Sequence, residues 1–394
     1  MTVALAQAMA LASSILAPML ALPPARAEQA AHERALELYD HGRPLRAIEE
    51  LCSAMERNLA AGGYAGETGG YSAELDALTL FWMVRETESW TSELARFLPL
   101  AEPLEPVSPQ ASFYVRYLHG EALRCSGRFE EARALFGSLG YCNDFLLVGP
   151  FDNERGSGFS VVHPPETAVD PGQALQGKER EVHWRENPCP EHALFRLTLE
   201  ELFQPAQQVL AYAATAVQAQ SARDVELRVG SSGPIKVILN GQELFARDAE
   251  RPHFPDQDRI VLPLCAGWNQ LVLKLAVEDG PWTIESRFCE LSGAPASGLV
   301  FDAKHCGRSA CSPRESEARG QPTLDVGLGG NPSDALASRA LALYHLVVHP
   351  DDRALDSDAR VAALAVELDP EDVGGRYLMA RALRPEVANR SEMA

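Results

Sequence analysis

Apolar residues recur at helical spacing from residue 28 to residue 142. In "ERALELYDHGRPLRAIEELCSAME", alanine and leucine fall on the inner faces of two short helices, and Gly42 marks the turn between them. The stretch "YLHGEALRCSGRFEEARALFGSL" repeats this arrangement with Gly127 at the turn, and we expect a divergent helix pair at residues 74–104 between the two copies. The pattern therefore predicts a helical domain over residues 28–142.

The apolar pattern changes between residues 143 and 295. Short alternating runs such as "DVELRVG", "IKVIL", "RIVLPLC" and "QLVLKLAV" are separated by turn residues, which is typical of antiparallel strands. In "VILNGQELF", Asn240 and Gly241 both tolerate positive φ and predict a tight hairpin. The stretch "LVGPFDNERGSGF" predicts the first strand and the turn that follows it. With at least seven strands expected, residues 143–295 predict an antiparallel β-sandwich.

The end of the chain is helical again. Residues 296–334 are rich in glycine, serine and proline and predict a linker that holds one strand at most. Residues 335–394, which include "ALASRALALYHLVVHP", carry alanine and leucine at helical spacing. The predicted fold class is therefore α+β multidomain, with helical segments on both sides of a β-sandwich.

Charge and the first residues place the chain in the cell. The net charge of -20 repels nucleic acid and anionic membrane surfaces, so a nucleic-acid partner is excluded. Residues 1–27 are apolar and end in Ala25-Arg26-Ala27, which predicts a signal peptide; an uncleaved membrane anchor is the alternative. No later stretch is long and apolar enough to cross a membrane. We therefore expect a periplasmic or secreted protein without a membrane span once the signal is cleaved.

All eight cysteines follow the predicted cleavage site, which suits an oxidising compartment and disulfide formation. Cys306 and Cys311 are the nearest local pair for a disulfide. Together with His305 they also offer zinc ligands, but no second cluster completes a tetrahedral site. A disulfide or buried thiols are the favoured interpretation.

The helical repeats and the order "VGPFDNERGSGF", "VHWRE", "ELRVGSSGPIKVILNG", "AGWNQLVLKL" carry two resemblances. The helix pairs resemble tetratricopeptide repeats, and the strand region resembles the galactose-binding-like jelly-roll modules of exported bacterial proteins. The whole order is similar to the amino-terminal half of large exported proteins that carry a transglutaminase-like domain further on. That resemblance implies repeats around a jelly roll, and the catalytic domain of those proteins has no counterpart here.

The sequence contains no motif of a known catalytic site. It lacks a nucleophile elbow, a zinc-protease motif, a phosphate-binding loop and a dinucleotide fingerprint. Asp152 and Glu166 are the best available carboxylate pair, and abundance in an acidic chain explains them equally well. We therefore expect no enzymatic activity.

The candidates for ligand binding are better than those for catalysis, although each also has a structural explanation. Trp184, Trp268 and Trp282 could stack on sugar rings, or they could fill the core of the sandwich. Asp152 and Asn153 could supply oxygens to a ligand, or they could bond the backbone of their turn.

The same region contains further polar residues with a structural or a binding explanation. Asn269 is expected to hold the turn beside Trp268, and Lys274 is expected to be solvated because it alternates with buried leucines. Asp256 and Asp258 in "FPDQDRI" could bind a structural calcium ion, although they supply only two of the six to eight oxygens it needs. No other cofactor is expected.

Three functions are compatible with these features. The leading hypothesis is a non-catalytic exported scaffold that binds a protein or peptide partner through its helical repeats. The alternatives are a carbohydrate-binding module that takes a glycan, and a truncated relative of a transglutaminase-like enzyme.

Overall fold

The fold is described from a computed structural model, which covers residues 24–64, 69–91, 93–188, 194–308, 311 and 321–322. Residues 1–23 of the predicted signal peptide and the helical segment 335–394 lie outside the described residues. No helix within the described ranges is long and apolar enough to span a membrane.

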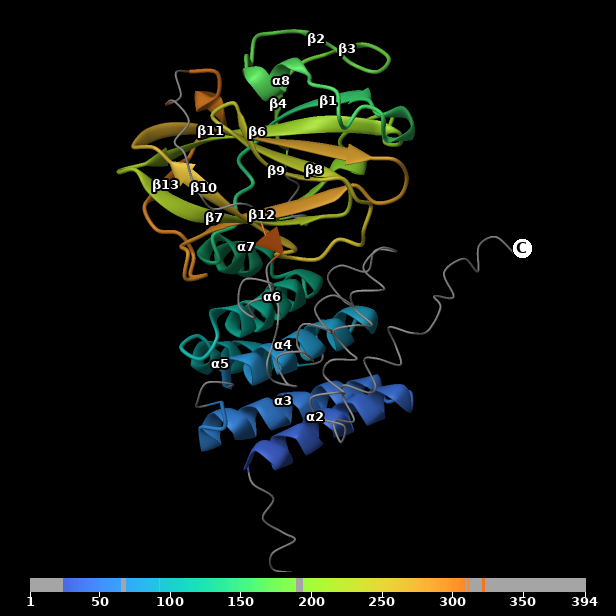
Figure 1. The fold of residues 1–394 in the computed structure, drawn as a ribbon. Coiled ribbons are helices and arrows are strands. Elements are labelled where there is room, and N and C mark those ends of the chain that lie inside the picture. The colour runs from blue at the N-terminus through green and yellow to red at the C-terminus, as the bar shows by residue number, and fades with distance from the viewer. Residues whose placement is uncertain are drawn as a thin grey trace, which may run out of the picture.

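The first described part is a stack of six helices, which we call the helical block (residues 24–138). Gly42 and Gly127 lie at the turns of the first and third helix pairs, as the sequence predicts. The predicted helices at residues 74–104 also form, and each of them packs on α3 and α6. In Figure 1 the helices follow one another from the blue end of the chain toward the sheets. The helices are α2 (Pro24–Asp40), α3 (Pro44–Ala61), α4 (Gly69–Glu86), α5 (Leu94–Leu104), α6 (Pro109–Cys125) and α7 (Phe129–Ser138).

Two local features show why the third helix pair forms where it does. The Ser108 hydroxyl accepts a hydrogen bond from the Ala111 amide at 3.1 Å and caps α6, with Pro109 at the first helical position. Gly120 lies where α6 meets α7, and a Cβ there would be 2.7 Å from the Phe136 ring. The small residue thus lets the two helices approach closely.

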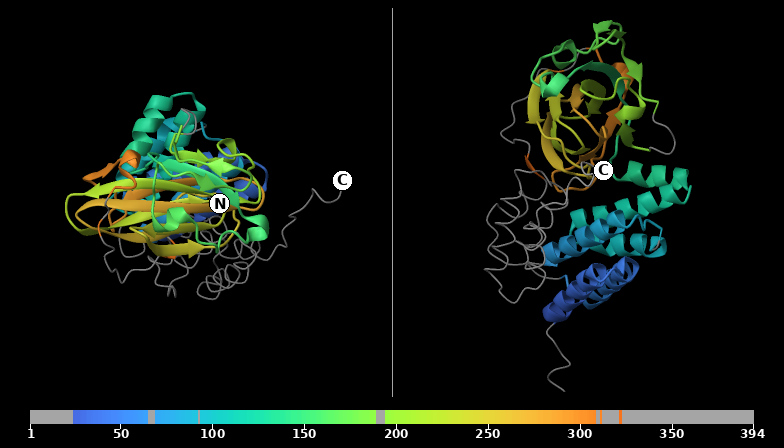
Figure 2. Two further views of the ribbon diagram at one scale, coloured as in Figure 1. Left: turned by 90° about the horizontal axis from the view of Figure 1, so that it is seen from above. Right: turned by 90° about the vertical axis from the view of Figure 1, so that its right-hand side faces the viewer.

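The second described part, which we call the sheet domain (residues 141–308 with 311 and 321–322), contains two facing antiparallel sheets. The larger sheet has the order β4-β1-β6-β11-β8-β9, with β13 also paired to β6, and the smaller sheet has the order β14-β10-β7-β12-β5. Figure 1 shows the smaller sheet nearer the helical block, and the right panel of Figure 2 shows the sheets curving around a common interior. Antiparallel pairing and the two-sheet arrangement are consistent with the predicted β-sandwich.

The strand bounds follow the sequence pattern closely at the centre of the domain. Asn240 and Gly241 both have positive φ and join β8 to β9, so the predicted hairpin is confirmed. The larger sheet contains β1 (Leu146–Asp152), β4 (Arg185–Glu186), β6 (Val209–Ala219), β8 (Ile235–Leu239), β9 (Gln242–Arg247), β11 (Gly267–Val277) and β13 (Leu299–Phe301). The smaller sheet contains β5 (Arg196–Thr198), β7 (Arg223–Ser231), β10 (Asp258–Leu264), β12 (Thr283–Cys289) and β14 (Gln321–Pro322). A separate pair, β2 (Leu175–Gln176) and β3 (Glu181–Val182), precedes β4.

Apolar residues cover both faces of the larger sheet. Its inner face shares one core with the smaller sheet, and Val225, Leu227 and Val229 of β7 point into that core. A second cluster lies on its outer face, where Phe159 packs among outward residues of β6 such as Tyr212. The chain between β1 and β4, which includes the short helix α8 (Pro164–Thr167), therefore covers the outer face.

The segment that leads from the helical block into β1 pairs with β12 through its backbone. The amide of Phe288 in β12 donates to the carbonyl of Gly140 at 2.9 Å, and the Cys142 amide donates to the Ser286 carbonyl at 3.2 Å. Gly140 has a φ of +87°, and a Cβ there would lie closer than 3.0 Å to the Phe288 carbonyl oxygen. The residue between the two parts must therefore be glycine.

The start of the stretch predicted as a linker is structured: β13 pairs with β6, and Asp302 begins a 3₁₀ turn that packs on the same strand. Cys311 forms a disulfide with Cys265 and not with Cys306, which is a buried free thiol. The zinc alternative fails with it, since the Cys311 sulfur is bonded covalently and the His305 ring stacks on Trp268. Cys189 lies outside the described residues.

Candidate functional site

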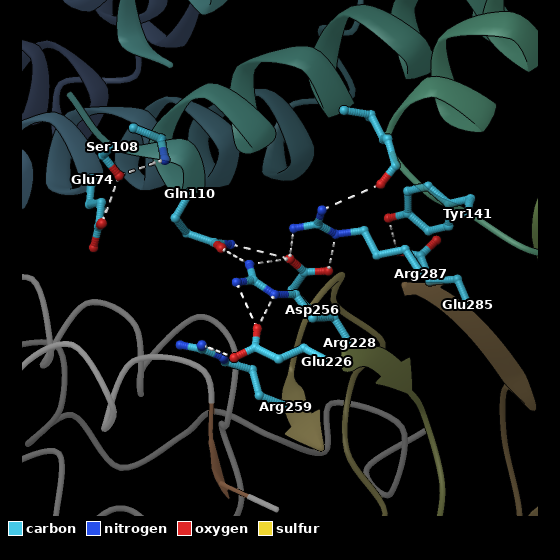
Figure 3. A network of polar contacts seen from close by, with 12 residues as sticks. Glu74, Ser108, Gln110, Tyr141, Glu226, Arg228, Asp256, Arg259, Glu285 and Arg287 are labelled. Atoms are coloured by element: carbon cyan, nitrogen blue, oxygen red, sulfur yellow. Dashed lines mark hydrogen bonds and ion pairs between the residues drawn. The ribbon is translucent and has the colours of Figure 1, made fainter. Parts of the chain in front are cut away.

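The outer face of the smaller sheet carries charged side chains where it meets the helical block. Strand alternation directs Val225, Leu227 and Val229 into the core, so Glu226 and Arg228 of β7 point toward the helices. The same alternation on β12 places Glu285 and Arg287 on that face. All of these charges are buried, and together with Asp256 they form the candidate site (Figure 3).

Asp256 lies at the centre of the first group. Arg287 donates to its two carboxylate oxygens at 2.8 and 2.5 Å, and Arg228 approaches one of them at 3.4 Å. Arg287 and Arg228 are direct partners across β12 and β7, and like charges in that position repel unless an anion lies between them. Burial alone would raise the pKa of the Asp256 carboxyl, but the nearby Arg287 outweighs it and the pKa is lowered.

The helical block contributes directly to this group through α6. The guanidinium of Arg287 lies over the Phe113 ring, 3.7 Å from its centre, and Gln110 donates to Asp256 at 3.4 Å. The side-chain amide oxygen of Gln110 accepts a hydrogen bond from Arg228. One carboxylate thus connects two strands of the sheet domain with one helix of the helical block.

The series of alternating charges continues to the edge of the sheet. Arg228 donates to Glu226 at 3.1 Å, and Arg259 of β10 bonds the other oxygen of the same carboxylate. Glu74 of α4 accepts from the Ser108 hydroxyl at 2.7 Å, and burial raises the pKa of its carboxyl although Arg228 and Arg259 are near. In Figure 3, the chain of contacts runs from Arg287 to Arg259, with Glu74 and Ser108 to one side.

Glu285 is the centre of a second group on the same face. Tyr117 of α6 donates to it at 3.1 Å and Tyr141 at 3.3 Å, and the Arg196 guanidinium is 3.5 Å away. Arg196 also pairs with Glu121 of α6 at 3.5 Å. Burial raises the pKa of the Glu285 carboxyl to about 7, with Arg196 opposing and Glu121 adding to the increase.

A small cavity adjoins this second group between the two parts of the molecule. Its volume is about 10 Å³, and its lining includes Tyr117, Glu121, Arg196 and Glu285. A space of this size holds roughly one water molecule. The cavity can accommodate a bridging water, but it cannot admit an organic substrate.

These distances indicate what the network does chemically. Buried guanidinium–carboxylate pairs with several hydrogen bonds fix geometry, and loss of one partner leaves an uncompensated charge. Within the described ranges, no three histidine, cysteine or acidic side chains gather in a way that could hold a metal ion. The network therefore holds the helical block against the sheet domain in one orientation.

The expectation of a solvated Lys274 is wrong. The side chain is fully buried on the outer face of the larger sheet, where its ammonium donates to Glu166 at 2.9 Å and to the Val161 carbonyl at 2.6 Å. Tyr212 donates to the same carboxylate at 2.7 Å. Burial lowers the pKa of the Lys274 ammonium, whereas the bonds from Lys274 and Tyr212 outweigh burial and lower the pKa of Glu166. This cluster fastens the covering loop to the sheet.

Asp152 and Glu166 do not act as a pair. Asp152 is exposed and pairs with Lys178 at 3.1 Å, whereas Glu166 is held by Lys274. Asn153 is buried, and its side-chain amide donates to the Val277 carbonyl at 3.3 Å. The Asn153 side chain therefore bonds the backbone of β11, 124 residues later in the chain, and not the backbone of its own turn as the structural explanation supposed.

The three tryptophans lie in different surroundings. Trp282 is 2% exposed in the central core and contacts Phe203, whereas Trp184 and Trp268 are partly buried against the outer cluster. Trp268 stacks on the His305 ring at 4.0 Å, and the side chain of Asn269 bonds the Cys265 amide at 2.9 Å and so holds the turn as predicted.

The register separates the candidate sugar-binding residues. On β11, Trp268 pairs with Gln218 of β6, and Val277 pairs with Val209, which is also the partner of Asp152. Trp268 and Asp152 therefore lie near opposite ends of an 11-residue strand, roughly 30 Å apart at the usual rise per residue. The structure does not bring them into one site.

The calcium hypothesis at Asp256 and Asp258 finds no support in the geometry. Asp256 is occupied by Arg287 and Arg228, and Asp258 bonds Arg251 and lies 3.0 Å from Arg247. The guanidinium groups around each carboxylate neutralise its charge and repel a cation.

The network itself was missed at the sequence level, although a signal for it exists. "DVELRVG" and "WTIESRF" both place Glu and Arg at alternate positions of strands whose other residues are apolar. Two neighbouring strands of this kind predict a charged face, but not what covers it. Comparison with models of known protein families, with curated proteins and with solved structures finds no match to this chain.

Proposed function

We propose that this protein is a non-catalytic exported scaffold that binds a protein or peptide partner through its helical block. The helix pairs of that block resemble tetratricopeptide repeats, with Gly120 against Phe136 where paired helices meet. Stacked helical hairpins commonly present a continuous surface to an extended partner. The Cys265–Cys311 disulfide supports an oxidising compartment.

The observation that carries the proposal is the charge network around Asp256. It joins β7 and β12 to α6 through buried contacts, so the helical block is presented at a fixed angle to the sheet domain, which resembles a jelly roll. A fixed orientation lowers the entropy lost when a partner contacts the helices. The proposal therefore assigns the sheet domain a positioning role.

The test is capture of a partner from the exported fraction with the tagged full-length chain. Asp256→Asn keeps the shape of the side chain but removes the charge that lies between Arg228 and Arg287. We expect the wild-type chain to recover a discrete partner and Asp256→Asn to recover less of it. Arg128→Ala, which removes an exposed ion pair with Glu131, is the matched control. Recovery of no discrete partner, or equal recovery by Asp256→Asn, would contradict the proposal.

A glycan-binding role of the sheet domain has less support. Trp282 is buried, and Trp184 and Trp268 are the two partly exposed rings among the candidates. Neither lies beside Asp152 at its end of the sheet.

A further inference from the structure

Helix α4 is covered on every side. Residues 75–84 are all buried, and they span almost three helical turns, so no direction around the axis faces water. Such a helix needs neighbours all around it. In a stack of helices, however, one face of each central helix points away from the stack.

The contacts of α4 identify that face. Asp76 bonds His32 of α2 at 2.7 Å, and Phe81 packs on Tyr114 of α6, which places α2 and α6 on two different sides. Of the two remaining sides, one carries Ala73, Ala77, Leu80 and Val84, and the small residues suit close packing against α3. The other carries Leu75, Leu78 and Trp82, which we call the α4 stripe.

The α4 stripe is apolar and almost completely buried. Leu75 and Leu78 are each 2% exposed and Trp82 is 7% exposed. Tyr39 of α2 contacts the edge of this stripe at Trp82, with ring centres 4.7 Å apart. Among the described elements, those packed along the length of α4 are α3 and α6. Phe81 places α6 on another side, and we infer from the small residues Ala73 and Ala77 that α3 lies on their side.

The described chain leads toward this surface. Its last residues form β14, which pairs with Asp258 and Arg259 of β10. Arg259 lies beside Glu226 in the charge network, and Glu74 of α4 lies on the same side of that network (Figure 3). Residues 323–394 thus continue from a point near the amino-terminal half of α4.

The remaining sequence has the composition to cover an apolar helix. Residues 335–394 carry alanine and leucine at helical spacing, as in "ALASRALALYHLVVHP", and amphipathic helices of this kind need an apolar surface to pack on. We propose that residues 335–394 dock in cis on the α4 stripe. The α4 stripe is then occupied by the protein's own chain, and a partner that binds there must displace it. The last step rests on the proposed function.

The test is to cut the chain between the two parts. A recognition sequence for a specific protease is inserted in the glycine-rich stretch 327–330, which leaves β14 with the body. After cleavage of the folded full-length protein, we expect the carboxy-terminal fragment to co-elute with residues 1–326 in gel filtration. Separation of the fragment from a body that keeps its circular dichroism spectrum would overturn the proposal.

Variants identify the surface that holds the fragment. Leu78→Asp on the α4 stripe should release it, whereas Leu45→Asp, at a residue of α3 that is 57% exposed, should retain it. Because Leu78→Asp can unfold the block, Leu343→Asp with Leu346→Asp in the fragment is the second variant, and it leaves the body unchanged. Retention by this double variant would overturn the proposal. A dimer that persists after the fragment is lost would assign the stripe to a second copy instead.

These outcomes are separable from failure of the proposed function. If the fragment is retained but no partner is captured, docking in cis stands and the scaffold role falls. If a partner is captured equally with and without the fragment, the partner binds elsewhere and displacement is excluded.

Discussion

Arg228 and Arg287 face each other across two strands, and Asp256 makes that arrangement stable by lying between them. Asp256 has a φ of +58°, a left-handed conformation that aspartate tolerates better than most residues. One loop residue therefore determines whether two buried cations can share a face. From the sequence the same residue suggested a cation site, because a D-x-D motif does not reveal that arginines lie around it.

Glu285 makes the stability of the protein depend on pH in an unusual direction. Its pKa in the folded chain is about 7, raised by burial from 4.5. The folded state therefore holds a proton that the unfolded state has lost, and the stabilisation present below pH 4.5 disappears as the pH rises through 7. The wild-type chain should lose about 3 kcal/mol of unfolding free energy relative to Glu285→Gln across this range.

The measurement is urea unfolding of both chains at a series of pH values. Glutamine imitates the protonated carboxyl, so the two curves should meet near pH 4.5 and diverge toward pH 8. Parallel curves over this range would show that the carboxyl titrates in the same way in both states.

At the scale of elements, local signals located the turns and strands correctly. The hairpin at Asn240-Gly241, the helix turns at Gly42 and Gly127 and the first strand before Asp152 all appear where the sequence predicts them. Each depends on backbone conformation within a few residues. Burial of Lys274 could not be predicted in this way, because its cover comes from a loop more than a hundred residues earlier in the chain.

The junction between α7 and β12 yields a prediction at the same scale. In Gly140→Ala, the new Cβ would collide with the Phe288 carbonyl, which strand pairing holds in place. The variant should lose about 1–3 kcal/mol more unfolding free energy than Gly127→Ala. Gly127 has a similar φ of +75°, and a Cβ added there would have no atom within 4 Å. The difference between the two variants therefore isolates the cost of the collision. Equal losses in thermal or urea unfolding would count against the junction described here.

At the scale of the whole molecule, the fold class and the order of the two described parts could be read from the sequence. Their attachment could not, since it depends on α6, on the loop that carries Asp256 and on two strands, all distant in the chain. The disulfide was missed for the same reason. Cys265 and Cys311 are 46 residues apart in the sequence, and nothing local distinguishes them from nearer pairs.

That separation makes the disulfide important for the stability of the sheet domain. Cys265→Ser removes the cross-link from the unfolded chain, which should cost about 2–4 kcal/mol of unfolding free energy for a loop of this length. Cys125→Ser is the control, because Cys125 is a free and exposed thiol. Equal midpoints of both variants in guanidinium chloride without reductant would contradict this role.

The loop that carries Glu166 makes the larger sheet the middle layer of three. Phe159 and Tyr212 pack on its outer side and the inner core fills the other, so water reaches the central strands β6 and β11 mainly at their ends. Amino-acid substitutions among relatives of this protein should therefore be rare on both faces of β6 and β11 and common in the connecting loops. Any surface that distinguishes one relative of this protein from another would then lie at the rim of the sheet domain or on the helices.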